Sequence, residues 1–235
     1  MPRLSAPFLR SFALIVALAT SLLAHTVVRA TPLIQPIGSA NFANTVLPGT
    51  SLAQRPELAG TVIDSLSTSF DFQGITGTVQ SRVVREDATG TLDFLWRIGV
   101  DSVASGTTGV VALRLVNFGY DFLTDADWRS DDPGTVAPSL ARLFNPAAYP
   151  TGSLNFVLDG SVDAGEQSYF FFLRTDATSY STSAYYDLLG GTAQNLSGIF
   201  STFAPTETTV PEPASSALVV LGLIAAGLAS RRRRA

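Results

Sequence analysis

The sequence predicts an all-β fold: an antiparallel, jelly-roll-like β-sandwich ectodomain, flanked by an N-terminal signal helix and a single C-terminal transmembrane helix. Apolar and polar residues alternate over most of the middle of the chain, which is the period of a half-buried strand. Gly, Ser, Thr, Asp and Pro interrupt this alternation about every ten residues, as turns do in sandwiches and barrels. One uncharged apolar run lies near each end of the chain.

These patterns divide the chain into five segments. We expect a signal peptide (1–30), a β-sandwich ectodomain (31–205), a linker (206–213), a transmembrane helix (214–230) and a basic cytoplasmic tail (231–235). About 175 residues are enough for one domain with its own hydrophobic core.

The first segment has the layout of a secretory signal peptide. Arg3 and Arg10 precede an apolar run over 12–24, and Val28-Arg29-Ala30 places small residues where signal peptidase requires them. The pattern predicts export by Sec-type machinery with cleavage after Ala30. An uncleaved N-terminal anchor is the alternative. His25, the only histidine, would be removed with the leader.

The ectodomain begins with a proline-rich lead-in over 31–58, which we expect to hold at most one edge strand. The alternation then predicts strands over 61–72, 78–86, 91–100, 109–118, 154–158, 167–175 and 196–203. Residues 78–100 form a β-hairpin, because Asp87-Ala88-Thr89-Gly90 supplies turn chemistry between two alternating runs. Both faces of 167–175 are apolar, which predicts a central strand. Alternation lapses over 120–150, where we expect a long loop with one helical turn at 139–144.

The last 26 residues combine three unlike pieces. Val210-Pro211-Glu212-Pro213 is extended, because each proline fixes its own φ and restricts the residue before it. Residues 214–230 carry no charge and as a helix would span roughly 25 Å, close to the hydrocarbon core of a membrane. The four arginines at 231–234 would stop translocation and stay in the cytoplasm. Hydropathy alone predicts a permanent membrane anchor.

The order of these pieces resembles the PEP-CTERM sorting signal of Gram-negative bacteria that make extracellular polysaccharide. The resemblance implies recognition by an exosortase, removal of the helix, and transfer of the protein to the cell surface or matrix. The matching residues are the sorting motif Val210, Pro211, Glu212 and Pro213, and the stop-transfer cluster Arg231, Arg232, Arg233 and Arg234. Two ectodomain stretches, VVREDATGTLDFLW and VDAGEQSYFFFLRTDATSY, also resemble a type of PEP-CTERM ectodomain without an assigned activity.

Composition restricts the chemistry of the exported part. The chain has no cysteine and no lysine, and residues 31–209 also lack histidine. Nucleophile–histidine pairs, Ser–Lys dyads, Schiff bases and zinc sites of imidazole or thiolate are therefore excluded there. The same residues hold 8 arginines against 18 acids, a formal charge of −10, which makes nucleic acid an unsuitable partner.

Five carboxylates fall within twelve residues and are the candidates for a metal site. Oxygen ligands of this kind suit calcium, although an EF-hand pattern fails because Arg129 falls at a ligand position. We expect no cofactor and a solvated acidic loop, with calcium as the alternative. The candidates are Asp121, Asp125, Asp127, Asp131 and Asp132.

Carbohydrate contact is the other candidate activity. Trp128 in the acidic segment, with Tyr185 and Tyr186, could stack against sugar rings, whereas Trp96 on an apolar strand face is expected in the core. Glu57, Glu86 and Glu166 are the glutamates available to a carboxylate-dependent hydrolase, but no spacing brings a pair together.

Two function hypotheses follow. The first is a non-enzymatic, exosortase-sorted surface or matrix protein with a structural or adhesive role in a polysaccharide-rich envelope. The second is a carbohydrate-binding module or a carboxylate-dependent glycoside hydrolase. The partners expected are an exosortase, Sec-type export machinery, the membrane and exopolysaccharide, with no nucleic acid.

Overall fold

The computed structural model describes residues 30–119, 121–150, 153–191 and 195–207. In this part the chain is all-β, with two antiparallel sheets and one short 3₁₀ helix, η1 (Pro56–Leu58). The described residues contain no helix long and apolar enough to cross a membrane. The predicted signal helix and transmembrane helix lie outside the described residues.

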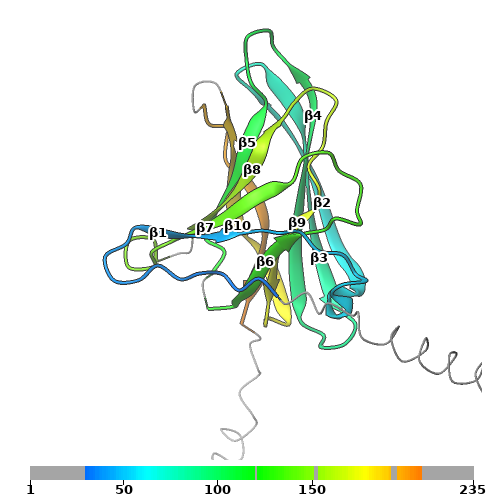
Figure 1. Cartoon of the computed structure of the whole chain (residues 1–235), viewed down its shortest axis with the longest axis vertical. Coiled ribbons are helices and arrows are strands. Elements are labelled where there is room, and N and C mark those ends of the chain that lie inside the picture. Colours follow the sequence, from blue (N-terminus) through cyan, green and yellow to red (C-terminus); the bar gives the residue numbers. More distant parts are fainter. Residues whose placement is uncertain (1–29, 120, 151–152, 192–194, 208–235) are drawn as a thin grey trace, which may run out of the picture.

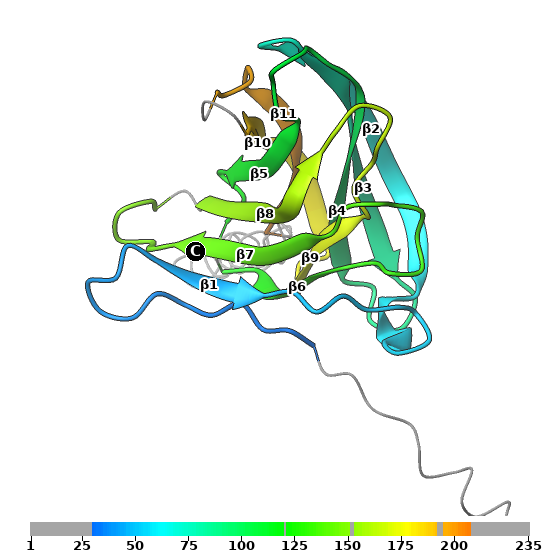
Figure 2. The same ribbon diagram turned by 45° about the horizontal axis from the view of Figure 1, so that its top comes forward.

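The two sheets face each other, with β2, β3 and β4 on one side and β5, β8 and β10 on the other (Figure 1). The five-stranded sheet has the order β2 (Gly60–Phe72), β3 (Ile75–Glu86), β4 (Leu92–Val103), β9 (Phe171–Thr175), β6 (Leu123–Trp128). The six-stranded sheet has the order β1 (Phe42–Val46), β7 (Pro138–Phe144), β8 (Ser153–Val162), β5 (Val110–Val116), β10 (Ser179–Gly190), β11 (Phe200–Thr206). Figure 2 shows β1, β7, β8 and β5 side by side in this order.

Local sequence explains the hairpins of the five-stranded sheet. Gln73 and Gly74 both have positive φ, 51° and 78°, which is the conformation that a two-residue turn between right-twisted strands requires. The hairpin predicted over 78–100 is confirmed as β3 and β4, with Gly90 at φ 75° in the turn. The lead-in contains the one edge strand expected, β1, which pairs with β7.

The core lies between the sheets and is centred on Trp96, whose side chain is buried as predicted. Its indole Nε1 donates to Thr202 Oγ1 of the opposite sheet at 2.9 Å, so the buried N–H is satisfied. The rings of Phe118, Phe156 and Phe171 surround it at centroid distances of 5.8, 6.2 and 6.5 Å. Because these rings come from both sheets, the indole ties the two layers together.

A second, smaller core lies on the outer face of the five-stranded sheet, where the lead-in covers it. Its members are buried apolar residues from η1, β3, β4 and the β9 region: Leu58, Val84, Leu95, Phe170 and Phe172. The four consecutive residues Phe170–Leu173 are all buried, which confirms that both faces of β9 are covered. β9 accordingly lies between β4 and β6.

Three strands depart from the sequence prediction. The segment 120–150 is not a long loop with a helical turn, because it contains β6 and β7. The alternation of β6 is hidden by Asp125 and Asp127, which are polar yet buried. In β7 the helix-like spacing of Leu140, Leu143 and Phe144 is overridden by pairing with β1 and β8 on either side. β10, with a bulge between Ser181 and Ala184, was not predicted at all.

Candidate functional site

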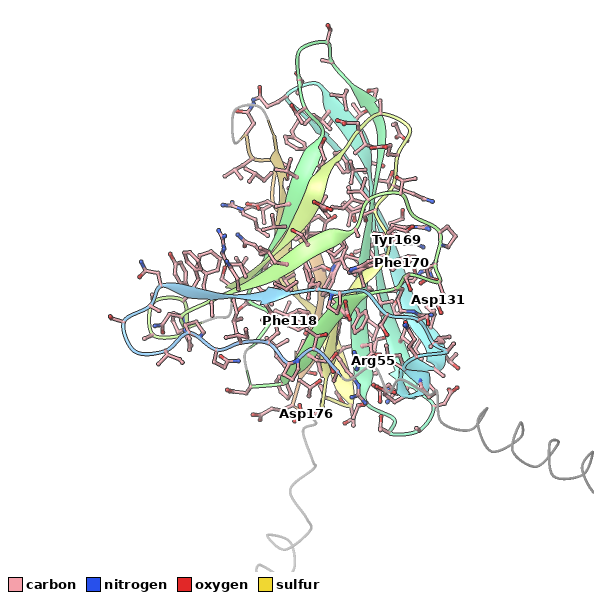
Figure 3. All side chains as sticks on the ribbon, viewed as in Figure 1. Arg55, Phe118, Asp131, Tyr169, Phe170 and Asp176 are labelled. Carbon is pink, nitrogen blue, oxygen red and sulfur yellow. The ribbon has the colours of Figure 1, made fainter. Side chains whose placement is uncertain are left out.

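A cluster of buried charges lies under the lead-in, on the outer face of the five-stranded sheet. Strand register places Asp93, Arg174 and Asp125 side by side on β4, β9 and β6. Arg55 lies in the lead-in (Figure 3), and its side chain is fully buried. It donates to Asp125 Oδ1 at 2.9 Å and to Asp125 Oδ2 at 3.2 Å. Its Nε also donates to Glu57 at 2.9 Å. This fork-to-carboxylate geometry satisfies a guanidinium that has lost its water.

A second arginine, Arg174, holds the buried Glu86. Arg174 donates from Nε to Glu86 Oε1 and from Nη2 to Glu86 Oε2, the second bond at 3.0 Å. Its Nη1 lies 3.9 Å from Asp125 Oδ2. Burial alone would raise the pKa of Glu86, but the bonds from Arg174 and Thr89 outweigh it and lower the pKa. Glu57 and Glu86 thus enter one arginine-bound network, whereas Glu166 accepts from the Asp163 backbone N–H.

Asp93 is the member of this cluster without a cation in contact. Asp93 is 3% exposed, and its Oδ1 has no hydrogen-bond partner among the described residues. Burial, followed by the negative charge of Glu86, raises the pKa of Asp93 to about 8. The cavity beside it holds about 10 Å³, room for at most one water, and is lined by Leu58, Val84, Asp93, Leu95, Arg129 and Phe172.

The five acidic candidates do not converge. Asp125 is bound by Arg55, and Asp127 accepts from the backbone N–H groups of Gly49 at 2.8 Å and Trp128 at 3.0 Å. Asp131 is exposed and pairs with Arg129, Asp121 lies in an exposed turn, and Asp132 is half-buried. Among the described residues no three His, Cys, Asp or Glu side chains are grouped so that they could hold a metal ion.

The aromatic candidates take different positions. Trp128 is half-buried, packs on Tyr169 at 4.8 Å and donates from Nε1 to the Leu47 carbonyl at 3.3 Å. A Cβ at Gly49 would lie 2.3 Å from its ring, so the lead-in covers one face of the indole. Tyr185 is exposed on the outer face of β10, and Tyr186 is buried in the main core.

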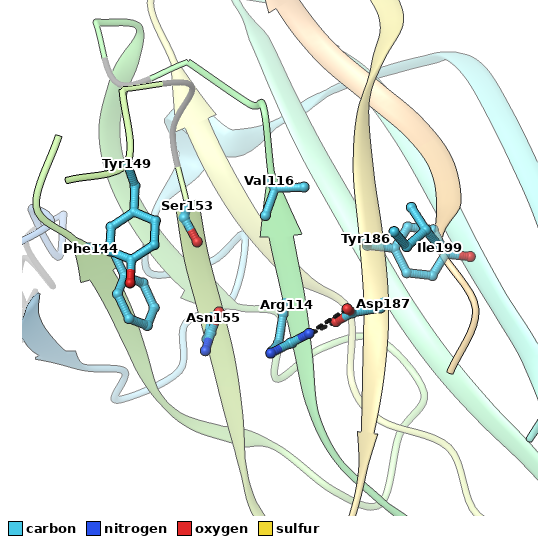
Figure 4. A pocket seen from close by; sticks show the side chains of 9 residues that line it. All are labelled: Arg114, Val116, Phe144, Tyr149, Ser153, Asn155, Tyr186, Asp187 and Ile199. Atoms are coloured by element: carbon cyan, nitrogen blue, oxygen red, sulfur yellow. Dashed lines mark hydrogen bonds and ion pairs between the residues drawn. The ribbon is translucent and has the colours of Figure 1, made fainter. Parts of the chain in front are cut away.

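A groove of about 330 Å³ crosses the outer face of the six-stranded sheet. Figure 4 shows Phe144 and Tyr149 at one end, the Arg114–Asp187 pair in the middle, and Ile199 at the other end. The groove is lined by Arg114, Val116, Phe144, Tyr149, Ser153, Asn155, Tyr186, Asp187 and Ile199. Tyr186 is the one sequence candidate in this lining, and its side chain is buried in the main core. Tyr185 lies next to the groove as the register partner of Val116.

Strand register builds the polar centre of the groove. Asn155 on β8 pairs with Arg114 on β5, and Arg114 pairs with Asp187 on β10. Arg114 donates from Nε to Asp187 Oδ1 at 2.6 Å, with a second bond from Nη2 to Oδ2. In the sequence these three residues are polar positions in separate strands, and nothing in the sequence reveals that the strands are neighbours.

The sorting residues Val210, Pro211, Glu212 and Pro213 and the arginines at 231–234 lie outside the described residues. The chain matches the family model described as the PEP-CTERM protein-sorting motif over residues 209–234. This match confirms the resemblance drawn from the tail. No curated protein and no solved structure matches the chain.

We expect Asp125→Asn to destabilise the domain by about 3–5 kcal/mol, because it leaves the buried Arg55 charge without its main counter-charge. The free energy of unfolding in urea measures this. Asp131→Asn is the matched control: it breaks the partly exposed pair with Arg129 and should cost less than about 1 kcal/mol. Equal losses in the two variants would contradict the role given to Asp125.

Stability should fall as pH rises from about 4 to about 8, because folded Asp93 keeps a proton that the unfolded chain releases near pH 4. Burial also raises the pKa of Asp127, which acts in the same direction. The lowered pKa of Glu86 stabilises the fold above about pH 4, so the stabilisation by Glu86 does not change between about pH 4 and about pH 8. Urea unfolding at about pH 5 and about pH 8 should show a flatter dependence in Asp93→Asn. An identical slope in parent and variant would refute this assignment.

Proposed function

We propose that this chain, which carries a PEP-CTERM protein-sorting motif at residues 209–234, is an exosortase-sorted surface or matrix protein with a structural or adhesive role. The motif match is the observation that carries the proposal, because it implies export, a membrane-held sorting signal and exosortase processing. The setting proposed is the polysaccharide-rich envelope of a Gram-negative bacterium.

The proposed route uses both ends of the chain. The leader over 1–30 directs the chain to Sec-type machinery, and residues 214–230 hold it in the inner membrane. The arginines at 231–234 keep the helix in place until exosortase acts at Val210–Pro213. The folded domain then passes to the cell surface or the extracellular matrix.

We propose that the exported domain is not an enzyme and uses no cofactor. Residues 31–209 lack histidine, cysteine and lysine, which removes most nucleophiles and general bases. Glu57 and Glu86 are held by arginines, and the cavity beside Asp93 is too small for a sugar. A carboxylate-dependent hydrolase needs two accessible carboxyl groups across a substrate cleft, and these contacts do not favour it.

A carbohydrate-binding role is the second candidate and is compatible with the first. The observation that favours it is the groove on the six-stranded sheet, where polar side chains and exposed aromatic or aliphatic groups share one surface. Such a role would let the domain adhere to exopolysaccharide after sorting.

The sorting motif is tested by replacing Pro211, Glu212 and Pro213 with alanine in the full chain. The variant should remain in the membrane fraction, because exosortase would no longer recognise it, whereas the parent should leave that fraction. Cell fractionation and immunoblotting measure the distribution. Thr206→Ala with Thr208→Ala, upstream of the motif, is the control and should behave as the parent. Unchanged sorting of the triple variant would refute exosortase processing.

A further inference from the structure

We propose that the groove on the outer face of the six-stranded sheet binds a neutral, hydroxyl-rich glycan, with Asn155, Arg114 and Asp187 as polar contacts and Tyr149 as a stacking wall. This inference deepens the proposed function, since it names the ligand class to which the sorted domain would adhere.

A sugar hydroxyl both donates and accepts hydrogen bonds, and the polar centre of the groove offers acceptors and donors for it. Arg114 can only donate, Asp187 can only accept when ionised, and Asn155 can do both. They lie on three adjacent strands in register, so their backbones are about 5 Å apart from strand to strand. This spacing allows one sugar unit to contact several of them at once. The Arg114–Asp187 fork also fixes both side chains before a ligand arrives.

Apolar side chains lie on either side of this centre. Tyr149 is 46% exposed and packs edge-on against Phe144 at 5.2 Å, which holds its ring in place. Val116 and Ile199 are 40% and 74% exposed, so apolar surface continues along the groove. A sugar ring has a C–H face as well as a hydroxyl rim, and this pairing of rings with hydrogen-bonding groups matches both.

Charge selects a neutral ligand. The groove lining contains one cation and one anion, and these pair with each other, so the lining has no net charge. Arg142 on β7 is the strand-register partner of Asn155 and lies beside this lining; its guanidinium stacks over the Phe42 ring at 4.4 Å and donates to Asn44 Oδ1, so it is engaged with β1. An acidic polymer would find no unpaired cation in the lining and would meet a domain of net charge −10.

The shape of the groove agrees with a short glycan segment. Its volume of about 330 Å³ is at the lower end of the roughly 300–1,000 Å³ of small-ligand clefts. The floor consists of paired β-strands with no bulge at the three polar residues, so binding requires no rearrangement of the sheet. A second copy of this chain is the competing occupant, because exposed apolar residues also suit self-association.

The test uses the full chain purified in detergent and isothermal titration with cellohexaose, laminarihexaose and dextran as neutral probes and alginate as an acidic probe. At least one neutral probe should bind. Asn155→Ala and Tyr149→Ala should each raise its Kd roughly tenfold, because each removes a central contact. Tyr149→Phe keeps the ring and should lose less affinity than Tyr149→Ala.

Matched controls lie on the other sheet. Asp101→Asn removes one exposed charge from β4, and Ile63→Ala removes one exposed apolar group from β2. Both should leave the Kd within about twofold of the parent, as expected for residues outside the interface. Thermal melting confirms that each variant is folded.

Three outcomes would overturn the proposal: no binding of any neutral probe, equal binding by the groove variants, or tighter binding of alginate. A concentration-dependent dimer that Tyr149→Ala dissociates would instead assign the face to a second copy. None of these outcomes bears on sorting, because titration uses purified chain, whereas the motif substitution is read from location in cells.

Discussion

The buried pair between Arg55 and Asp125 is the interaction on which the arrangement of this domain depends. A guanidinium that is fully buried must be paired, and its partner stands on β6, the edge strand of the five-stranded sheet. The pair therefore holds the lead-in against that sheet. The same lead-in supplies β1, whose Phe42 packs on Phe144 at 6.0 Å, and Phe144 lines the groove of the other sheet. One ion pair thus helps to place residues on both layers of the sandwich.

The two outer faces of the sandwich are used differently. On the five-stranded sheet the lead-in covers a small core and a charge cluster in which carboxylates outnumber arginines, so a protonated Asp93 reduces the excess negative charge. On the six-stranded sheet the central polar row of Asn155, Arg114 and Asp187 remains at the surface and forms a groove. The first arrangement stabilises the fold, and the second leaves hydrogen-bonding groups at the surface, where we propose that a ligand binds.

Local patterns predicted what depends on local sequence. The hairpin of β3 and β4 follows from alternation and a turn containing Gly90, and the sorting motif is read from a continuous tail. The pattern does not predict β6, because Asp125 and Asp127 are polar residues that can be buried only by accepting hydrogen bonds from residues far away in the sequence. Arg55 donates to Asp125, and the Gly49 backbone N–H donates to Asp127. The groove was missed for a related reason. Its polar residues meet only because β8, β5 and β10 are neighbours in the sheet, an order that no single strand encodes.

We propose that export of the folded domain removes a segment from each end of the chain: the leader over 1–30 and, after sorting, the helix with its arginine cluster. The most direct test is the intact mass of the protein recovered from cells. The account predicts a mass below that of the 24.8 kDa full chain by both the leader over 1–30 and the helix with its arginine cluster. A mass equal to the full chain, or to the chain without its leader alone, would contradict it.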